Sequence, residues 1–353
     1  MTDHAVQEFS TMAAERCTRL LDSAEQLLAA ASRREPLWHS DSKSGACIER
    51  VELDGHAYIV KHLDVTMDWT LRTVGDFGGA NRAMWTRGLL ARMPDCLNQP
   101  IVAVARGPKR AWGGEVTVLI MEDVGQWMVP AGDDPIPLEQ HLTFMSHMAA
   151  LHATFWNAGP EIDLIPASNR LMELSPWLVT TESELGSDAI IPSLVGRGWA
   201  TFADVAPHSR VVAELAFDPS PLVAALELTP STLVHGNWKL GNLGTDDGGR
   251  TVVIDWESPG RGAPCSDLAW YLAINSARLP QSKEATAEAY RCALENHGID
   301  TAPWWDDQLR LALLGGIVQF GWEKALGGPG DELDWWLAQA DEGARVLAVG
   351  PGC

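Results

Sequence analysis

The sequence is poor in basic residues and lacks long apolar runs. Lysine and arginine number 26 among 353 residues, against 47 aspartates and glutamates, which leaves a net charge of −21. Such a chain would repel phosphate backbones, so a broad nucleic-acid-binding surface is excluded. The negative charge would suit a cationic ligand, but it also favours solubility, so it does not predict a ligand. Because no apolar run approaches the ~20 residues of a membrane-spanning helix, we expect no membrane partner.

Paired cysteines and a secretion signal are also missing. The six cysteines are scattered and include no Cys-x-x-Cys pair, so neither a disulfide framework nor a structural zinc site is expected. The polar residues 1–4 lack the basic and apolar segments of a signal peptide. We therefore expect a protein of the reducing cytoplasm. With 46% hydrophobic residues, the chain is long enough for a large core in two lobes or domains.

The first third of the chain has the pattern of a small sheet. Leucines at near-helical spacing predict a helix over residues 5–33. Residues 47–53 and 56–63 alternate apolar and polar side chains around the turn dipeptide Asp54-Gly55, which predicts a β-hairpin. The other elements expected here are a helix at 80–93 and strands at 101–106 and 115–121. The pattern predicts a strand-rich lobe that ends near residue 124.

Beyond Pro137 the pattern is mainly helical. Residues 142–156 predict a long amphipathic helix, and residues 160–230 hold several helical stretches whose order the pattern does not give. Short β-like runs at 233–234 and 252–254 are followed by helices at about 266–278, 283–296, 304–326 and 330–347. We expect an α+β protein with a sheet lobe over residues 1–124 and a larger helical lobe over 125–353.

One stretch carries most of the chemical information. Residues 233–243 read as a short strand that delivers polar side chains to a loop, and residues 252–257 read as a second strand after a glycine-rich turn. A hairpin of this kind holds Asn242 and Asp255 at the same end of the strand pair. An amide oxygen beside a carboxylate is a ligand set suited to Mg²⁺, which keeps its other positions for water and phosphate oxygens.

This stretch resembles the catalytic segment of the aminoglycoside phosphotransferase and choline kinase-like families, within the protein-kinase-like superfamily. Their pattern is His-Gly-Asp, four residues, Asn, and then an apolar strand that ends in Ile-Asp-Trp/Phe-Glu; here it reads His235-Gly236-Asn237, Asn242 and residues 254–257. Residues 267–269 match the family's Asp-Leu-Ala at a helix start. Each element alone also suits an ordinary hairpin with a helix cap, but the joint spacing favours the kinase-like fold.

The resemblance implies a two-lobed protein-kinase-like fold and a reaction. The reaction is transfer of the γ-phosphate of ATP (or GTP), with Mg²⁺, to a hydroxyl of a small molecule. Asn242 and Asp255 would hold the metal, and Lys61 at the end of the second hairpin strand would grip the α- and β-phosphates. The loop that covers the phosphates would contain Ser42, Ser44 and Gly45, and the hinge that pairs with the nucleotide base would contain Met121, Glu122 and Val124.

The remaining matches have modest roles. His235 suits a scaffold for the catalytic loop better than a base. Lys239 lies two residues after position 237, where protein kinases keep a lysine on the transferring phosphate, although a solvent-facing lysine is nearly as plausible. We interpret Asp267 chiefly as a helix N-cap and His152 as a buried structural histidine.

Two positions depart from the family. Asn237 stands where the family has Asp, which accepts or orients the proton of the attacking hydroxyl. The chain is then a silenced natural member, an engineered variant or a still active enzyme; we favour an active scaffold whose base is removed or replaced, with a catalytically silent pseudokinase that binds nucleotide as the alternative. No glutamate occurs between Glu52 and Glu115, so the usual helix partner of Lys61 is missing, and Asp76 or Asn81 remains as a substitute.

The acceptor is predicted only as a class. Candidate acceptor-binding residues are Glu257, Trp238, Trp304, Trp322 and Trp336, because acidic side chains pair with cationic antibiotics and indole faces stack on rings. For most of these tryptophans, helix packing is the better interpretation. We expect an antibiotic of aminoglycoside or nucleoside type, or a sugar-like metabolite. A protein substrate is disfavoured because no activation segment is recognisable between Asp255 and Asp267. The oligomeric state stays open.

Overall fold

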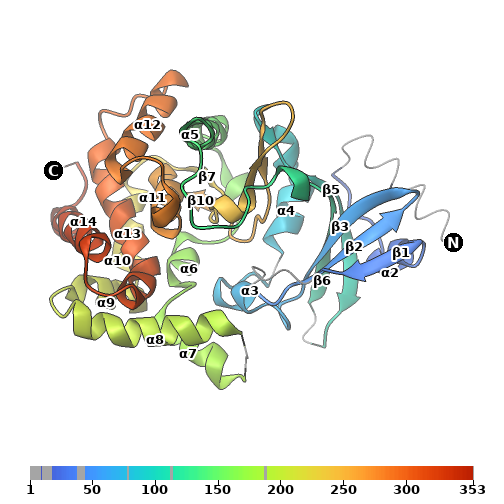
Figure 1. Ribbon diagram of the computed structural model, residues 1–353, viewed down its shortest axis with the longest axis horizontal. Helices are drawn as coiled ribbons and strands as arrows, with labels where there is room; N and C mark the ends of the chain where they lie inside the picture. Colours follow the sequence, from blue (N-terminus) through green and yellow to red (C-terminus); the bar gives the residue numbers. More distant parts are fainter. Residues whose placement is uncertain are drawn as a thin grey trace.

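The computed structural model describes residues 9, 18–37, 44–77, 79–111, 114–186 and 189–352. Figure 1 shows two lobes side by side, an N-terminal lobe built on a sheet and a larger C-terminal lobe of helices. The sheet has five antiparallel strands in the order β1-β2-β3-β6-β5. Their bounds are β1 Arg33–Pro36, β2 Cys47–Leu53, β3 His56–Leu63, β5 Ile101–Lys109 and β6 Glu115–Glu122.

The two faces of the sheet serve different cores. Val60 and Ile120 face the short helix α2 (Ala24–Leu28) in a small core of the N-terminal lobe. Leu63 and Leu119 belong instead to the main core, with side chains of α4 (Ala80–Thr86). Because side chains alternate along a strand, Lys61 shares the face of Leu63 and is paired with Leu119 across the sheet. Lys61 is thereby directed towards the C-terminal lobe.

Short elements join the lobes. α3 (Trp69–Thr73) and α4 follow β3, and then come the 3₁₀ turn η1 (Leu90–Arg92) and β4 (Leu97–Asn98). β4 does not join the large sheet; it pairs in parallel with β9 of the C-terminal lobe. The chain then crosses through residues 123–137, which include the 3₁₀ turn η2 (Gly125–Trp127).

The C-terminal lobe is organised around α13, whose residues are mostly buried. α8, α11 and α14 pack against it. The helices are α5 Leu138–Thr154, α6 Ala167–Met172, α7 Pro176–Glu184, α8 Ile190–Val205, α9 Arg210–Phe217, α10 Ser220–Glu227, α11 Pro264–Ile274, α12 Lys283–Asn296, α13 Trp305–Leu326 and α14 Asp331–Val349. Short strands β7 (Thr232–Val234), β8 (Leu243–Thr245), β9 (Thr251–Val253) and β10 (Gly260–Gly262) and the 3₁₀ turns η3 (Pro160–Ile162), η4 (Leu240–Asn242) and η5 (Ser276–Arg278) complete it.

The predicted fold class, α+β with an antiparallel-sheet lobe and a mainly helical lobe, is confirmed. The hairpin and the last four helices are confirmed with small shifts at their ends. The helix over residues 5–33 is wrong at its C-terminal end, because residues 33–36 form β1 and the helix there spans only residues 24–28; most of residues 5–17 lie outside the described part. The helix predicted over 80–93 is interrupted at Gly88, which adopts a positive φ of 68°. Within the described residues, no helix is long and apolar enough to cross a membrane.

Candidate active site

Lys61 joins the two lobes through buried carboxylates. Its Nζ donates to Asp255 Oδ1 at 2.5 Å and to Glu257 Oε1 at 2.7 Å. Burial alone would lower the pKa of Lys61, but the carboxylates of Asp255, Glu257 and Asp68 outweigh it and hold the pKa above its ordinary value. A charged ammonium from the N-terminal lobe therefore faces the segment that follows β9.

The two carboxyl groups at Lys61 differ in charge. Burial would raise the pKa of Asp255, but the ammonium groups of Lys61 and Lys239 hold it well below its ordinary value. Burial and the neighbouring charge of Asp255 raise the pKa of Glu257 to about 8. Two like charges this close do not both ionise readily, so the proton near neutral pH resides on Glu257 and the charge on Asp255.

The catalytic-loop candidates lie directly beside Asp255. Asn237 Nδ2 donates to Asp255 Oδ2 at 3.1 Å, while Asn237 Oδ1 is buried and has no hydrogen-bond partner. The backbone N–H of Asn237 donates to His235 Nδ1 at 3.1 Å, and His235 Nε2 donates to the carbonyl of Ile254 at 3.1 Å. Burial lowers the pKa of His235, which fits this neutral tautomer. With both ring nitrogens engaged, His235 acts as a scaffold.

Aromatic rings enclose this histidine. The ring centroids of His235 and Trp256 lie 4.4 Å apart, and Trp238 meets His235 edge-on at 5.8 Å. Both indoles are almost fully buried, and neither Nε1 has a hydrogen-bond partner. The catalytic loop therefore packs against buried aromatic side chains.

Asp267 anchors the loop, and its predicted role as a helix cap is wrong. α11 begins at Pro264 after Ala263, without a side-chain cap. The buried Asp267 carboxylate instead accepts hydrogen bonds from the backbone N–H groups of His235 at 2.7 Å and Gly236 at 2.8 Å. It also lies 3.2 Å from His152 Nε2, whose other ring nitrogen bonds the hydroxyl of Tyr290. His152 is buried and structural, as the sequence predicted.

Asn242 and Asp255 lie at the same end of the β8–β9 hairpin. Asn242 comes directly before β8, and its carbonyl accepts from the N–H of Ile254 at 3.1 Å. Its Nδ2 donates to the carbonyl of Asn237 at 2.9 Å, which leaves Oδ1 for a cation. No group of three His, Cys, Asp or Glu side chains suited to a metal occurs in the described part of the chain. The oxygens of Asp255 and Asn242 would suit Mg²⁺, which would take the rest of its shell from phosphate oxygens and water.

Two acidic residues near Lys61 and Lys239 were missed in the sequence. Asp68 is fully buried; its Oδ1 accepts from Thr70 N–H at 2.9 Å at the start of α3, and its Oδ2 has no partner. Glu173, at the end of α6, is half-buried, and burial raises its pKa to about 7 although the charge of Lys239 lowers it. Neither belongs to a motif; only the N-cap pattern at Asp68 offered a local signal.

The predicted phosphate-covering loop is described in part. Ser42 lies outside the described residues. Ser44 and Gly45 lie between β1 and β2, and the carbonyl of Ser44 accepts from the N–H of Trp69 at 3.0 Å. A Cβ at Gly45 would lie 2.7 Å from the carbonyl oxygen of Met67, so only glycine allows this close approach to the α3 segment. Ser44 and Gly45 therefore lie against the segment that contains Asp68.

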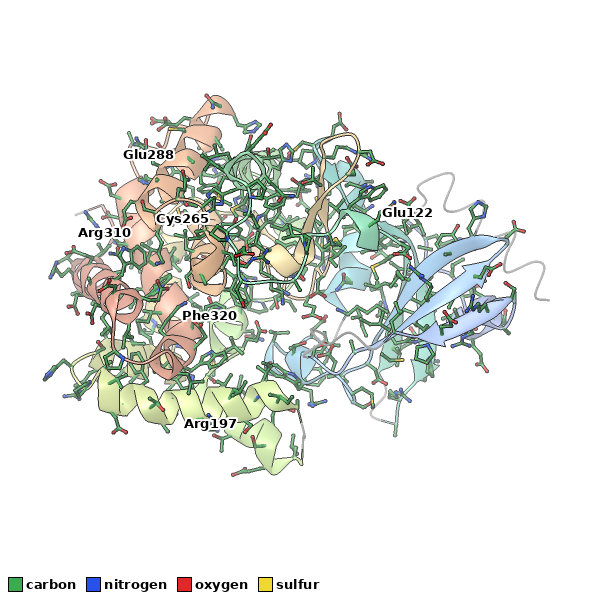
Figure 2. All side chains as sticks on the ribbon, viewed as in Figure 1. Glu122, Arg197, Cys265, Glu288, Arg310 and Phe320 are labelled. Carbon is green, nitrogen blue, oxygen red and sulfur yellow. The ribbon has the colours of Figure 1, made fainter. Side chains whose placement is uncertain are left out.

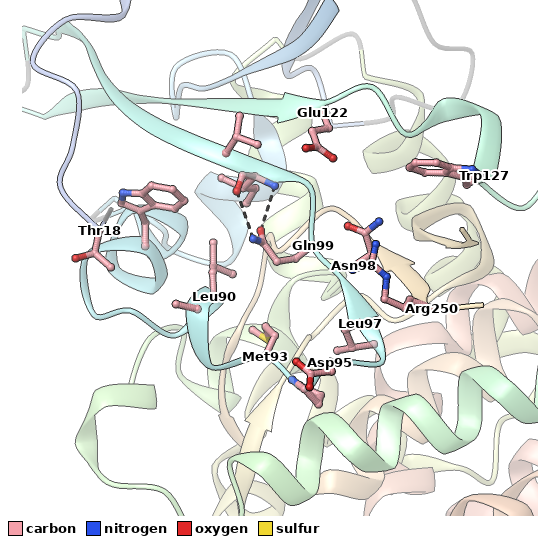
Figure 3. A pocket seen from close by; sticks show the side chains of 15 residues that line it. Thr18, Leu90, Met93, Asp95, Leu97, Asn98, Gln99, Glu122, Trp127 and Arg250 are labelled. Carbon is pink, nitrogen blue, oxygen red and sulfur yellow. Dashed lines mark hydrogen bonds between the residues drawn. The ribbon is translucent and has the colours of Figure 1, made fainter. Parts of the chain in front are cut away.

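The predicted hinge is at the end of β6. Figure 2 shows Glu122 at the junction of the lobes, far from Cys265 and Phe320 inside the helical lobe. The N–H of Glu122 donates to the carbonyl of Pro100 at 2.9 Å and is not free for a nucleotide base. A cavity of about 350 Å³ lies at the hinge. Figure 3 shows its lining, which includes Glu122, Trp127, Gln99 and Arg250. Gln99 is fixed there by two hydrogen bonds to the backbone of Ile101.

The structure does not bring the predicted acceptor-binding tryptophans to Lys61. Trp304 packs against Trp156 at 5.5 Å, and Trp336 donates to Glu332 within α14. Trp238, Trp304, Trp322 and Trp336 all belong to the main core. Glu257, the acidic acceptor-binding candidate, accepts a hydrogen bond from Lys61 and does not lie on an open surface. A separate cavity of about 380 Å³ lies between α6, α10, β10, α11 and α13, and Gly236 forms part of its wall.

A match to one family model supports the resemblance over part of the chain. The chain matches none of the curated proteins. Similar solved structures include a thermostable mutant of aminoglycoside phosphotransferase APH(4)-Ia (16% identity, 92% of this chain and 97% of that chain, TM-score 0.43) and choline kinase LicA from Streptococcus pneumoniae (11%, 91% and 95%, 0.47). A microcompartment-associated aminopropanol kinase is a third (14%, 92% and 95%, 0.46). Residues 198–302, which carry the catalytic-loop candidates, match the model of the phosphotransferase enzyme family, so the predicted resemblance is confirmed over this segment.

Proposed function

We propose that the chain is a small-molecule kinase. It moves the γ-phosphate of ATP or GTP, with Mg²⁺, to a hydroxyl of an antibiotic of aminoglycoside or nucleoside type or of a sugar-like metabolite. One observation carries the proposal: Lys61 of the sheet lobe meets Asp255 of the helical lobe at 2.5 Å, and Asn237 is hydrogen-bonded to that same carboxylate. We place the boundary between the lobes at residues 124 and 125.

Each residue has a defined task in this proposal. Asp255 and Asn242 hold the cation, and Lys61 bonds the α- and β-phosphates. The bound Mg²⁺ would supply the positive charge that offsets the phosphate oxygens during transfer. Lys239, whose charge lowers the pKa of Asp255, neutralises the phosphoryl group as it moves. The phosphates are covered by Ser44 and Gly45. The binding site of the nucleotide base is lined by Met121, Glu122 and Val124.

Asn237 orients the acceptor but does not take its proton. Its Nδ2 is engaged by Asp255, whereas the buried Oδ1 has no partner and is free to accept a hydrogen bond from a hydroxyl. An amide oxygen does not accept a proton at neutral pH, so general-base assistance worth about 10²- to 10⁴-fold is lost. Phosphoryl transfer depends mainly on positioning and charge neutralisation, so a slow reaction persists.

The cavity beside Gly236 offers room for the body of the acceptor. Ser168, Ser231, Ser266, Asp163 and Glu227 line it, together with Arg170 and Arg261, and Arg261 pairs with Asp163 at 2.7 Å. A polar lining with hydroxyl groups suits a polyhydroxylated molecule. Its wall at Gly236 adjoins Asn237, which supports delivery of a hydroxyl to the loop.

A silent, nucleotide-binding pseudokinase is the second candidate. The observation that favours it is the absence of a carboxylate at position 237, while Lys61, Asn242 and Asp255 are kept. Both functions need Mg²⁺-dependent nucleotide binding, and only the first transfers phosphate.

The test compares the protein with the Asn237→Asp variant. Phosphate transfer from labelled ATP and GTP is measured on a panel of aminoglycosides, nucleoside antibiotics, choline and sugars, and nucleotide affinity is measured by calorimetry with and without Mg²⁺. We expect both proteins to bind Mg²⁺–nucleotide and the Asp form to be about 10²- to 10⁴-fold faster on one class of acceptor. Binding without transfer by either form would favour the pseudokinase, and no binding by either would reject both functions.

A further inference from the structure

The helix beneath the sheet lacks the glutamate that usually fixes the phosphate-binding lysine. In protein kinases that lysine pairs with a glutamate of the same lobe. Here α4 contains no carboxylate, and Asp76 caps its start by accepting from Gly79 and Ala80 N–H groups. Lys61 therefore needs another partner.

α4 contributes an amide instead. Asn81 is 2% exposed, and its Nδ2 donates to the carbonyl of Trp256 at 2.6 Å. This hydrogen bond runs from the N-terminal lobe to the residue between Asp255 and Glu257. The helix thus holds the backbone that carries both partners of Lys61.

The local backbone explains why both side chains reach one ammonium. Asp255 adopts a left-handed φ of 67°, and the N–H of Glu257 donates to the carbonyl of Asp255 at 2.9 Å. Extended backbone would also place the side chains of residues 255 and 257 on the same side of the chain. The tight turn brings these two side chains closer together. A left-handed non-glycine residue is uncommon and needs support from its surroundings, which the Asn81 hydrogen bond provides.

From this geometry we infer that Glu257 is the positioning residue for Lys61 and that Asn81 fixes Glu257 through the carbonyl of Trp256. The inference rests on the proposed function. Glu257 keeps Lys61 in place when Asp255 turns to a cation, so the ammonium stays available to the phosphates. Without Glu257, Lys61 has only Asp255 and competes with Mg²⁺ for it.

The test measures nucleotide affinity, the half-saturating Mg²⁺ concentration, kcat and KM in Lys61→Ala, Glu257→Met, Asn81→Ala and the double variant Asn81→Ala/Glu257→Met. We expect Lys61→Ala to lose nucleotide binding and Glu257→Met, which removes the acceptor oxygen, to raise both the nucleotide Kd and the Mg²⁺ requirement about tenfold, a difference of about 1.4 kcal/mol. Asn81→Ala should act in the same direction, and the double variant should be no worse than Glu257→Met, because both residues act on one lysine. Glu257→Gln keeps a neutral acceptor for Lys61 and should stay close to the parent.

Glu115→Gln is the matched control. Glu115 pairs with Arg82 of α4 at 3.0 Å but has no contact with Lys61 among the described interactions, so its loss should leave the Mg²⁺ requirement unchanged. Normal Mg²⁺ and nucleotide dependence in Glu257→Met, with binding lost in Lys61→Ala, overturns the inference and leaves the proposed function intact. Unchanged nucleotide binding in Lys61→Ala rejects both. An equal effect of Glu115→Gln would show that the substitutions at Asn81 and Glu257 act only through general packing, which would also overturn the inference.

Discussion

At the scale of single residues, the site is a set of acidic groups around one ammonium. The carboxyl groups of Asp255, Glu257 and Asp68 lie within the field of Lys61, and Asn237 contributes an N–H where a further carboxylate would repel Asp255. The amide at 237 therefore relieves repulsion in the absence of a cation. A protein with Asp at this position would depend more strongly on a bound cation for its stability.

Glu257 makes stability depend on pH. Its folded pKa of about 8 lies above its ordinary value of 4.5, so its contribution to the free energy of unfolding is complete below pH 4.5 and is lost as the pH rises towards 8. The raised pKa of Lys61 leaves that group charged throughout this window. We expect the thermal midpoint of Glu257→Gln to exceed that of the parent increasingly from about pH 5 to pH 9. Parallel midpoints across this range would contradict the assignment.

At the scale of elements, the catalytic loop is held by α11. Asp267 satisfies two backbone N–H groups of the loop and one nitrogen of His152, all in the interior. In Asp267→Ala these donors stay buried without partners, and we expect a loss of about 3–5 kcal/mol in the free energy of unfolding, measured with urea. Asp306→Ala, at the exposed first turn of α13, is the control and should lose less than about 1 kcal/mol.

The sequence allowed most regular elements and the centre of the site to be predicted. Alternating side chains around Asp54-Gly55 specified the hairpin, and the spacing from His235 to Asp255 specified the loop. β1 was missed because all four of its residues are exposed and carry no apolar alternation; its partner β2 defines it. The helices between residues 160 and 230 could not be ordered, because prolines and glycines divide them into short pieces.

The partner of Lys61 was not predictable in the same way. Sequence spacing suggested Asp76 or Asn81 as its substitute partner, yet Asp76 caps α4 and Asn81 bonds Trp256. The pair with Glu257 depends on the left-handed turn at Asp255 and on a contact between lobes. Neither the turn nor the contact between the lobes produces a recognisable pattern in the sequence. Trp304, Trp322 and Trp336 lie in the main core, because large apolar rings are buried first, whereas Trp238 packs against His235 of the catalytic loop.

At the scale of the whole molecule, a second connection ties the lobes away from the hinge. Arg72 of α3 makes two hydrogen bonds to Glu182 of α7, at 2.8 and 2.6 Å, and Asn169 donates to the carbonyl of Val74 at 3.0 Å. Figure 1 shows α3 between the sheet and the helices of the C-terminal lobe. Opening of the lobes must therefore break a half-buried ion pair.

Release of nucleotide should respond to this tie. In Glu182→Gln the charge-assisted pair with Arg72 is lost, and we expect nucleotide to dissociate up to about tenfold faster, as about 1.4 kcal/mol would produce. Stopped-flow displacement of a fluorescent ADP measures the rate. Arg210→Gln, in the exposed pair with Glu214, is the control and should leave the rate unchanged. Equal rates in Glu182→Gln and the parent would show that the tie does not limit opening.

The indole of Trp256 has a practical consequence. It is embedded between the two carboxyl-bearing residues and lies against the imidazole of His235, so any charge arriving at this turn alters the electric field across the ring. The protein thereby contains its own optical sensor. Subtracting the emission of a Trp256→Phe variant isolates this fluorophore from the other fifteen of the 16 tryptophans, and occupancy is read without any attached dye.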